Sequence, residues 1–190
     1  DKNPHHVSYN YEGRDKRDTL GSSLRVAYDA PWFKMTSITA YRGYNDVTRN
    51  DQDFMPYDLI TAKEDIKDRQ FTQEFRFASP EGSGPLKWLG GLYLYKKHQD
   101  HTLDLNYGQG AADMGMVPMA MTNAADSDIK TYGYAVFGQA TYTLFDKLDL
   151  TAGLRYEYEK NKLDYASDYL AGGMVVPGMG SDIRGRKHDR

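Results

Sequence analysis

The sequence predicts an all-β fold: an antiparallel transmembrane β-barrel, present as a segment of about six strands that form three hairpins. Three observations predict this class. Strand-like segments longer than about 12 residues recur along the chain, whereas soluble strands usually have about 5 or 6. Apolar and polar residues alternate along several of these segments. The spacers between them are alternately short and long, as in bacterial outer-membrane barrels.

Composition excludes several other classes. Hydrophobic residues make up 39% of the chain and charged residues 27%, and the mean hydropathy is -0.75, so no segment approaches the roughly 18 apolar residues of a membrane helix. The 16 Tyr suit a surface that meets both lipid and water. The absence of Cys excludes disulfide scaffolds and thiolate metal sites. With a net charge of -3 there is no basic excess, so we expect no nucleic-acid partner.

Three hairpins follow one another along the chain. Ala30 and Pro31 form the first turn, a stretch rich in Ser, Pro and Gly at 79–85 forms the second, and Asp146 with Lys147 forms the third. A remnant of a further strand is predicted near residues 7–12, and the tail 166–190 is a Gly-rich, polar stretch. The six predicted strands cover residues 19–29, 32–49, 63–78, 86–105, 131–145 and 147–165.

The alternation of spacers also predicts the side of the membrane on which each connection lies. Outer-membrane barrels have short turns on the periplasmic side and long loops on the extracellular side. We therefore expect the three short turns to be periplasmic. The spacers around Asp51, Gly108 and Gly172 should be extracellular.

Alternation assigns the two faces of the third and sixth strands, because side chains in a strand point to opposite faces in turn. Gln73 interrupts the pattern, since it falls on the apolar side. Tyr132 and Tyr142 lie about one membrane crossing apart and could mark the two aromatic girdles. The second and fourth strands do not alternate cleanly and receive no assignment. The predicted lipid-facing residues are Phe75, Phe77, Leu148, Leu150, Leu154 and Tyr156, and the predicted lumen-facing residues are Thr72, Glu74, Arg76, Thr151, Arg155 and Glu157.

Six strands cannot close a membrane barrel, because the smallest bacterial barrels have about 8. An open edge in lipid would leave unpaired backbone groups, each at a cost of several kcal/mol. We therefore expect residues 1–190 to form part of a barrel domain, without a plug domain, whose other strands lie elsewhere. A water-soluble β-sandwich, for example in a secreted adhesin, is the alternative, since its strands also alternate.

Three segments resemble hairpins of TonB-dependent receptors. They are FTQEFRFASP at 71–80 with WLGGLY at 88–93, YAVFGQATYTLFDKLDLTAGLRY at 134–156, and TSITAYR at 36–42. The resemblance implies a barrel of about 22 strands with a plug in its lumen. It further implies active uptake of a scarce ligand, such as a ferric siderophore, vitamin B12 or a glycan, driven by the TonB system.

The resemblance to that family also implies where the protein lies and what it contacts. The protein would lie in the outer membrane of a Gram-negative bacterium, in contact with lipid and lipopolysaccharide. It would contact the TonB system through parts outside these residues, and it would be neither an enzyme nor a cofactor-binding protein. A passive porin or structural barrel is the alternative function, since it has the same lipid-facing surface and needs no energy coupling.

Two groups of residues could hold a metal ion. His98 and His101 are three residues apart in a strand, which places them on opposite faces, so a solvated strand extension is favoured over a metal site. Asp51, Asp53 and Asp58 lack the spacing and the glycine of a calcium loop and are better explained as a charged extracellular loop. No metal site is predicted.

Two further groups could bind or act on a ligand. Thioethers can hold Cu(I), but a loop that offers adaptable apolar contacts to a ligand is the favoured interpretation of the methionines. Glu157 and Glu159 share a face, as paired glycosidase carboxylates would, but with Arg155 beside them they are better explained as a polar lumen lining. The candidates for substrate contact are Met114, Met116, Met119 and Met121.

Overall fold

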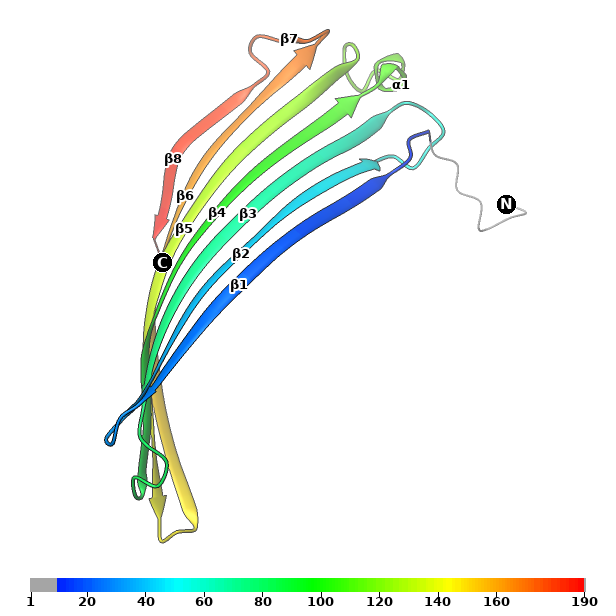
Figure 1. Ribbon diagram of the computed structural model, residues 1–190. Coiled ribbons are helices and arrows are strands. Elements are labelled where there is room, and N and C mark those ends of the chain that lie inside the picture. Colours follow the sequence, from blue (N-terminus) through cyan, green and yellow to red (C-terminus); the bar gives the residue numbers. More distant parts are fainter. Residues whose placement is uncertain (1–9, 190) are drawn as a thin grey trace, which may run out of the picture.

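The computed structural model describes residues 10–189, with side chains to residue 183. It forms one curved antiparallel sheet in which each long strand pairs with its neighbours in sequence (Figure 1). The long strands are β1 (Arg14–Asp29), β2 (Lys34–Asp51), β3 (Ile60–Ala78), β4 (Leu86–Tyr107), β5 (Met121–Leu144) and β6 (Leu148–Ala171). These six strands confirm the predicted ones, and most extend further toward the long loops.

Three short elements complete the described residues. Helix α1 (Gln109–Asp113) lies in the loop between β4 and β5. Strands β7 (Met174–Val175) and β8 (Ser181–Asp189) both pair with β6. Of the remnant predicted near residues 7–12, residues 7–9 lie outside the described part and 10–12 are not in a strand. No helix within residues 10–189 is long and apolar enough to cross a membrane.

The tail differs from the sequence prediction, which treated residues 166–190 as a polar stretch. In the structure β6 continues to Ala171, and the chain then returns as β7 and β8. Polar strands of this kind carry no apolar face that a pattern search could detect, because backbone pairing rather than side-chain burial holds them. The sheet therefore has eight strands where the sequence predicted about six.

All short turns lie at one end of the sheet, and all long loops with α1 lie at the other (Figure 1). In the third turn Lys147 N–H donates to the Leu144 carbonyl oxygen at 3.1 Å, and Phe145 and Asp146 both have positive φ, 52° and 55°. Positive φ at both central positions is the signature of a type I′ turn, whose twist matches that of the strands it joins. The alternation of short and long connections is thus present as predicted.

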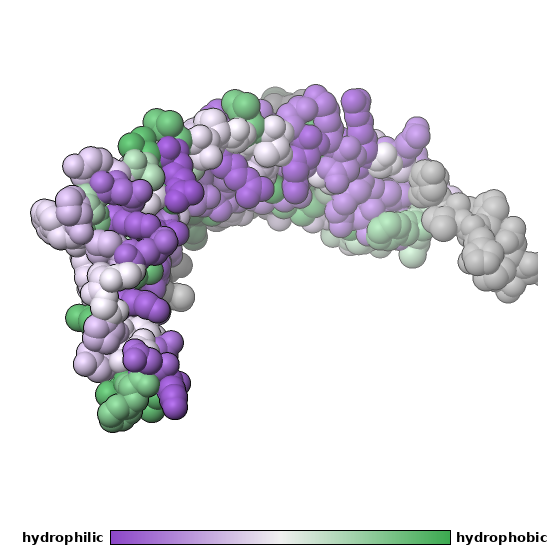
Figure 2. Space-filling model, turned by 60° about the horizontal axis from the view of Figure 1, so that its bottom comes forward, coloured by the Kyte–Doolittle hydropathy of each residue, from purple (hydrophilic) through white to green (hydrophobic). Residues whose placement is uncertain are grey.

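The sheet is curved (Figure 2), and its two faces differ in burial. Residues that share a rung of the sheet share a face, so the strand register defines both faces. Side chains converge on the inside of a curve, so the face that holds the buried residues is the concave one. Asp51, at the loop end of β2, is an exception. The buried strand residues on the concave face are Asp46, Ala62, Asp68, Met121, Ala125, Ala135 and Ser167.

The convex face carries a band of exposed apolar residues, which shifts along the register from strand to strand. On β1 the band ends, toward the turns, at Tyr28, which lies in the same rung as Leu154 of β6. On β6 the band continues six residues closer to the turn, to Leu148. Six residues over five strand steps correspond to a strand tilt of about 40°, given a rise of about 3.3 Å per residue and a strand spacing of about 4.8 Å. Such a tilt is typical of membrane barrels.

Candidate functional site

Charged and aromatic side chains line the concave face in the half of the sheet nearer the short turns. Arg76 forms a bidentate ion pair with Glu74 on β3, with Nε–Oε1 and Nη2–Oε2 distances of 2.7 and 3.0 Å. On β6, Arg155 donates to Oε2 of Glu157 through Nε at 3.2 Å and Nη2 at 3.1 Å. The register places the two arginines in one rung and the two glutamates in the next.

The predicted lumen-facing and lipid-facing sets lie on opposite faces of the sheet. Thr72, Glu74, Arg76, Thr151, Arg155 and Glu157 lie on the concave face. Phe75, Phe77, Leu148, Leu150, Leu154 and Tyr156 lie on the convex face, where Leu154 is 82% exposed. The assignment of the two faces to lumen and lipid stays a prediction.

Glycines make room for aromatic rings on the concave face. The Tyr95 side chain crosses Gly133, where an added Cβ would come within 2.3 Å of the ring, and its hydroxyl donates to Glu159 on the next strand. Similarly, a Cβ on Gly91 would come within 2.5 Å of the Phe137 ring. These rings therefore lie flat along the wall and leave the space in front of it open.

Toward the loops, the concave wall holds two almost fully buried carboxylates. Asp46 is 6% exposed and forms an ion pair with Arg17 of β1. Asp68 is 5% exposed, with Lys97 Nζ at 3.1 Å from its Oδ2. Arg17 holds the pKa of the Asp46 carboxyl below its ordinary value, mainly through the hydrogen bond it donates. Each of the two aspartates is therefore held in place by a basic side chain from a neighbouring strand.

The sequence did not identify these aspartates. Asp46 lies on the second strand, where the two faces do not alternate, so no pattern distinguishes it. Asp68 continues the period-two series of Thr72 and Gln70 on β3 and could have been found by extending that series toward the loop. Their cationic partners come from other strands and become visible only with the strand register.

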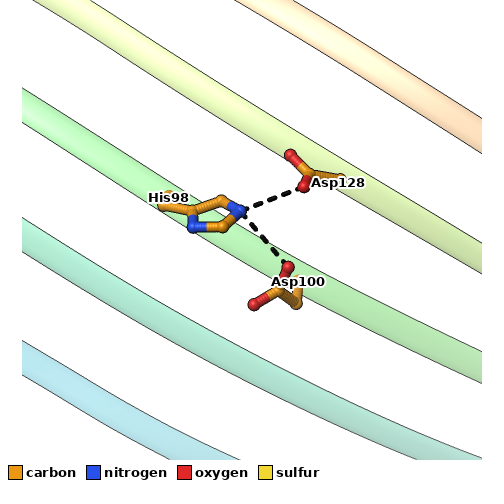
Figure 3. A group of neighbouring side chains, drawn as sticks. All are labelled: His98, Asp100 and Asp128. Atoms are coloured by element: carbon orange, nitrogen blue, oxygen red, sulfur yellow. Dashed lines mark hydrogen bonds and ion pairs between the residues drawn. The ribbon is translucent and has the colours of Figure 1, made fainter. Parts of the chain in front are cut away.

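His98 and His101 point to opposite faces of β4, as their spacing predicts. On the concave face, His101 Nε2 is 2.7 Å from Glu64 Oε1. On the convex face, His98 Nε2 is 3.1 Å from Asp128 Oδ2 and 3.3 Å from Asp100 Oδ1 (Figure 3). The potential ligand atoms of these three convex-face residues lie within 4.8 Å of one another. Asp100 could have been paired with His98 by period-two spacing, whereas Asp128 comes from β5 and requires the register.

Burial tends to raise the pKa of Asp128, but hydrogen bonds from Lys130 and His98 outweigh that effect, so the pKa lies below its ordinary value. His98 therefore bridges Asp100 and Asp128 in one polar cluster, in which the partners of Asp128 favour its ionised form. The cluster borders an open depression of about 390 Å³ with several aspartates in its lining.

The aspartates of loop 52–59 and its flank bind backbone groups. Asp51 Oδ1 accepts from the N–H groups of Asp53 and Phe54 at 3.1 and 3.2 Å. Asp53 accepts from Met55 N–H at 2.9 Å and from Ile60 N–H at 2.7 Å. These carboxylate oxygens therefore cap the loop by accepting its backbone N–H groups.

Two of the long loops are joined by hydrogen bonds. Gly108 N–H donates to the Leu59 carbonyl oxygen at 2.9 Å, and Gly110 N–H donates to the Asp58 carbonyl oxygen at 3.0 Å. A Cβ on Gly108 would lie 2.2 Å from Asp58 Cγ, so only glycine allows this approach. Loops 52–59 and 108–120 therefore form one unit.

The joined loops expose several large apolar side chains. Met121 is 5% exposed and belongs to the concave wall, so the four methionines do not share one environment. The exposed side chains of the joined loops offer adaptable apolar contacts. The exposed ones are Phe54, Met55, Tyr57, Met114, Met116 and Met119.

Comparisons with known proteins agree with this architecture. A family model described as TonB dependent receptor-like, beta-barrel, matches residues 1–180. The structure is similar to that of the ferric yersiniabactin uptake receptor FyuA from Yersinia pestis, with a TM-score of 0.63 and 19% sequence identity. The match covers 93% of this chain and 24% of that receptor, so the chain spans about a quarter of the receptor's length.

Proposed function

The chain belongs to the TonB-dependent receptor β-barrel family, and we propose that it forms part of the wall of a barrel of about 22 strands that imports a ferric siderophore. Members of this family are transporters of the Gram-negative outer membrane and not enzymes. The family match over residues 1–180 is the observation that carries the proposal. The choice of siderophore over vitamin B12 or a glycan is supported by the fold shared with a ferric yersiniabactin receptor.

In this proposal, the convex face meets lipid and lipopolysaccharide, and the concave face lines the lumen. Ion-paired side chains such as Arg76 with Glu74 and Arg155 with Glu157 keep the wall polar and wet without a large net charge. A polar solute can then pass along the wall without losing its hydration. Coupling to the TonB system, and a plug that gates the lumen, belong to parts of the protein beyond residues 1–190.

The joined loops supply the first contact with the ligand in this proposal. Their exposed Met and aromatic side chains can adapt to an amphiphilic molecule of irregular shape. Below them, Asp46 and Asp68 give the upper concave wall fixed carboxylates beside Arg17 and Lys97. The arrangement offers apolar contacts at the rim and charged hydrogen-bonding groups deeper in the wall.

An uptake assay tests the proposal. The intact protein would be expressed in a Gram-negative host without other siderophore receptors, and accumulation of labelled ferric siderophore, cobalamin and an oligosaccharide would be measured. We expect ferric siderophore uptake that stops when a protonophore removes the energy source. Uptake that continues unchanged with the protonophore would identify a passive porin, and energy-dependent uptake of another substrate would contradict the siderophore assignment.

A further inference from the structure

The convex face changes character abruptly at the loop end of its apolar band. On β5 the band runs from Tyr142 to Tyr132, both exposed. Ten residues at a tilt of about 40° span roughly 25 Å along the barrel axis, which matches the apolar height of a membrane barrel. Tyr132 therefore marks the outer edge of the band, where an aromatic girdle is expected.

The first charged convex-face residue beyond the band is a cation on each of four adjacent strands. These residues, which we call the basic belt, are Arg69 on β3, Lys96 on β4, Lys130 on β5 and Lys160 on β6. On β4, β5 and β6 the next acidic residue on the same face is an aspartate two or four residues further out: Asp100, Asp128 and Asp164. The sequence of layers is therefore apolar, aromatic, basic and then acidic.

The side chains of the belt are placed to meet a ligand from outside the barrel. Arg69 and Lys96 are exposed. Lys96 Nζ lies 5.5 Å from the centre of the Tyr132 ring. Lys130 is held by Asp128, with Nζ–Oδ2 at 3.0 Å, and Arg69 by Asp100 at 3.8 Å. Each of these contacts leaves further N–H donors of the cation available.

Charge and height together identify the ligand. Phosphorylated headgroups lie directly beyond the hydrocarbon edge of the outer leaflet, and each Lys or Arg near such a surface adds to the attraction. We infer that the basic belt binds the phosphate groups of outer-leaflet glycolipid, that is, of lipopolysaccharide. The inference rests on the proposed function only in that the convex face must contact lipid.

A set of matched variants tests the belt in the intact receptor. The belt variant combines Arg69→Gln, Lys96→Gln and Lys130→Gln. The control variant combines Arg14→Gln, Arg49→Gln and Lys63→Gln, which lie in one rung of the same face nearer the loops and change the net charge equally. A third variant, with Arg69→Lys, Lys96→Arg and Lys130→Arg, keeps the charge of the belt.

Binding of lipopolysaccharide to the detergent-purified receptors would be measured by native mass spectrometry, after a heat-resistance gel has verified folding. We expect binding to the belt variant to be about tenfold weaker or more, and binding to the control and charge-conserving variants to stay within about twofold of wild type. Equal loss in the belt and control variants, or loss in the charge-conserving variant, would overturn the inference.

Two further arms identify the source of the phosphate. The same glycolipid after enzymatic removal of its phosphates should bind the wild type about as weakly as intact glycolipid binds the belt variant. Inorganic phosphate at millimolar concentration should not displace the lipid; displacement would mean a site for free phosphate instead. Siderophore uptake by the belt variant reports on the proposed function separately, because no belt residue lines the concave wall.

Discussion

At the residue scale, the position of Gln73 is explained by its partners. Thr39 Oγ1 donates to Gln73 Oε1 at 2.6 Å, and Gln73 Nε2 donates to Ser37 Oγ at 3.0 Å and to the Glu74 carbonyl oxygen at 3.2 Å. All three polar side chains lie on the convex face within the apolar band. Their groups satisfy one another, which is what lipid requires of polar groups that it surrounds.

Removal of one partner of Gln73 should lower the free energy of unfolding more than replacement of Gln73 itself by an apolar residue. Thr39→Val leaves Gln73 Oε1 without a donor in lipid and should lower the free energy of unfolding by about 1 to 3 kcal/mol. Gln73→Leu removes the need for both partners and should be close to neutral. Folding of the intact barrel into lipid vesicles, titrated with urea, measures both changes. A larger loss for Gln73→Leu than for Thr39→Val would contradict this account.

The depth of each convex-face residue predicts the cost of placing a charge there. Leu154 lies near the middle of the apolar band, so Leu154→Arg should cost about 2 to 4 kcal/mol, whereas Leu150→Arg, nearer the turn, should cost less. Thr151→Arg, on the concave face, should be tolerated. The same vesicle titration measures all three variants, and equal costs at Leu154 and Thr151 would mean that the two faces are wrongly assigned.

At the scale of elements, the packing of Tyr95 across Gly133 ties β4, β5 and β6 together. Gly133→Val would force the ring away from the wall and should destabilise the barrel by about 1 to 3 kcal/mol. Gly138→Ala is the control, because the nearest atom, the Leu89 carbonyl oxygen, would be 3.8 Å from the new Cβ. Thermal unfolding of the reconstituted barrel would show the difference, and similar midpoints for both variants would argue against a structural role for Tyr95.

The pair of Arg17 and Asp46 should make the upper β1–β2 hairpin sensitive to acid. The pKa of Asp46 is lowered in the folded state, so its contribution to stability is present above the ordinary aspartate pKa of about 3.9. That contribution is lost as the pH falls through the lowered pKa. Amide hydrogen exchange at the loop end of β1 should therefore accelerate below about pH 4, and Asp46→Asn should remove this pH dependence.

At the scale of the whole molecule, the open edges should prevent this segment from folding alone in a bilayer. β1 and the turn end of β6 have no outer partner strand among the described residues, and unpaired backbone groups in lipid cost several kcal/mol each. A polypeptide of residues 1–190 should therefore give no protease-protected strands in vesicles, whereas the intact receptor should. Protection of the isolated segment as a monomer would contradict this expectation.

The sequence predicted the strands whose two faces differ in polarity, because apolar and polar residues alternate along them. β6 shows apolar residues from Leu148 to Tyr158 at every second position, and the two faces of β3 are almost as clear. The sequences of β7, β8 and the loop ends of the long strands lack this alternation, so no such pattern identifies them. Their existence depends on backbone pairing, which leaves little trace in the side chains.

The candidate site was less predictable for a related reason. Glu74 and Arg155 follow from alternation within one strand, but Arg17 with Asp46, Lys97 with Asp68 and His98 with Asp128 join residues of different strands. A single sequence does not contain the register between strands that do not alternate. The ion pairs across strands therefore had to come from the structure.

The strands continue well past the apolar band. β5 extends eleven residues beyond Tyr132 to Met121, which raises the joined loops roughly 25 to 30 Å above the edge of the apolar band at the tilt found here. A solute arriving from the medium thus reaches the rim before it comes near any headgroup. A dense layer of sugars on the cell surface would cover the lower part of these strand extensions. The joined loops at their end would stay accessible to a ligand.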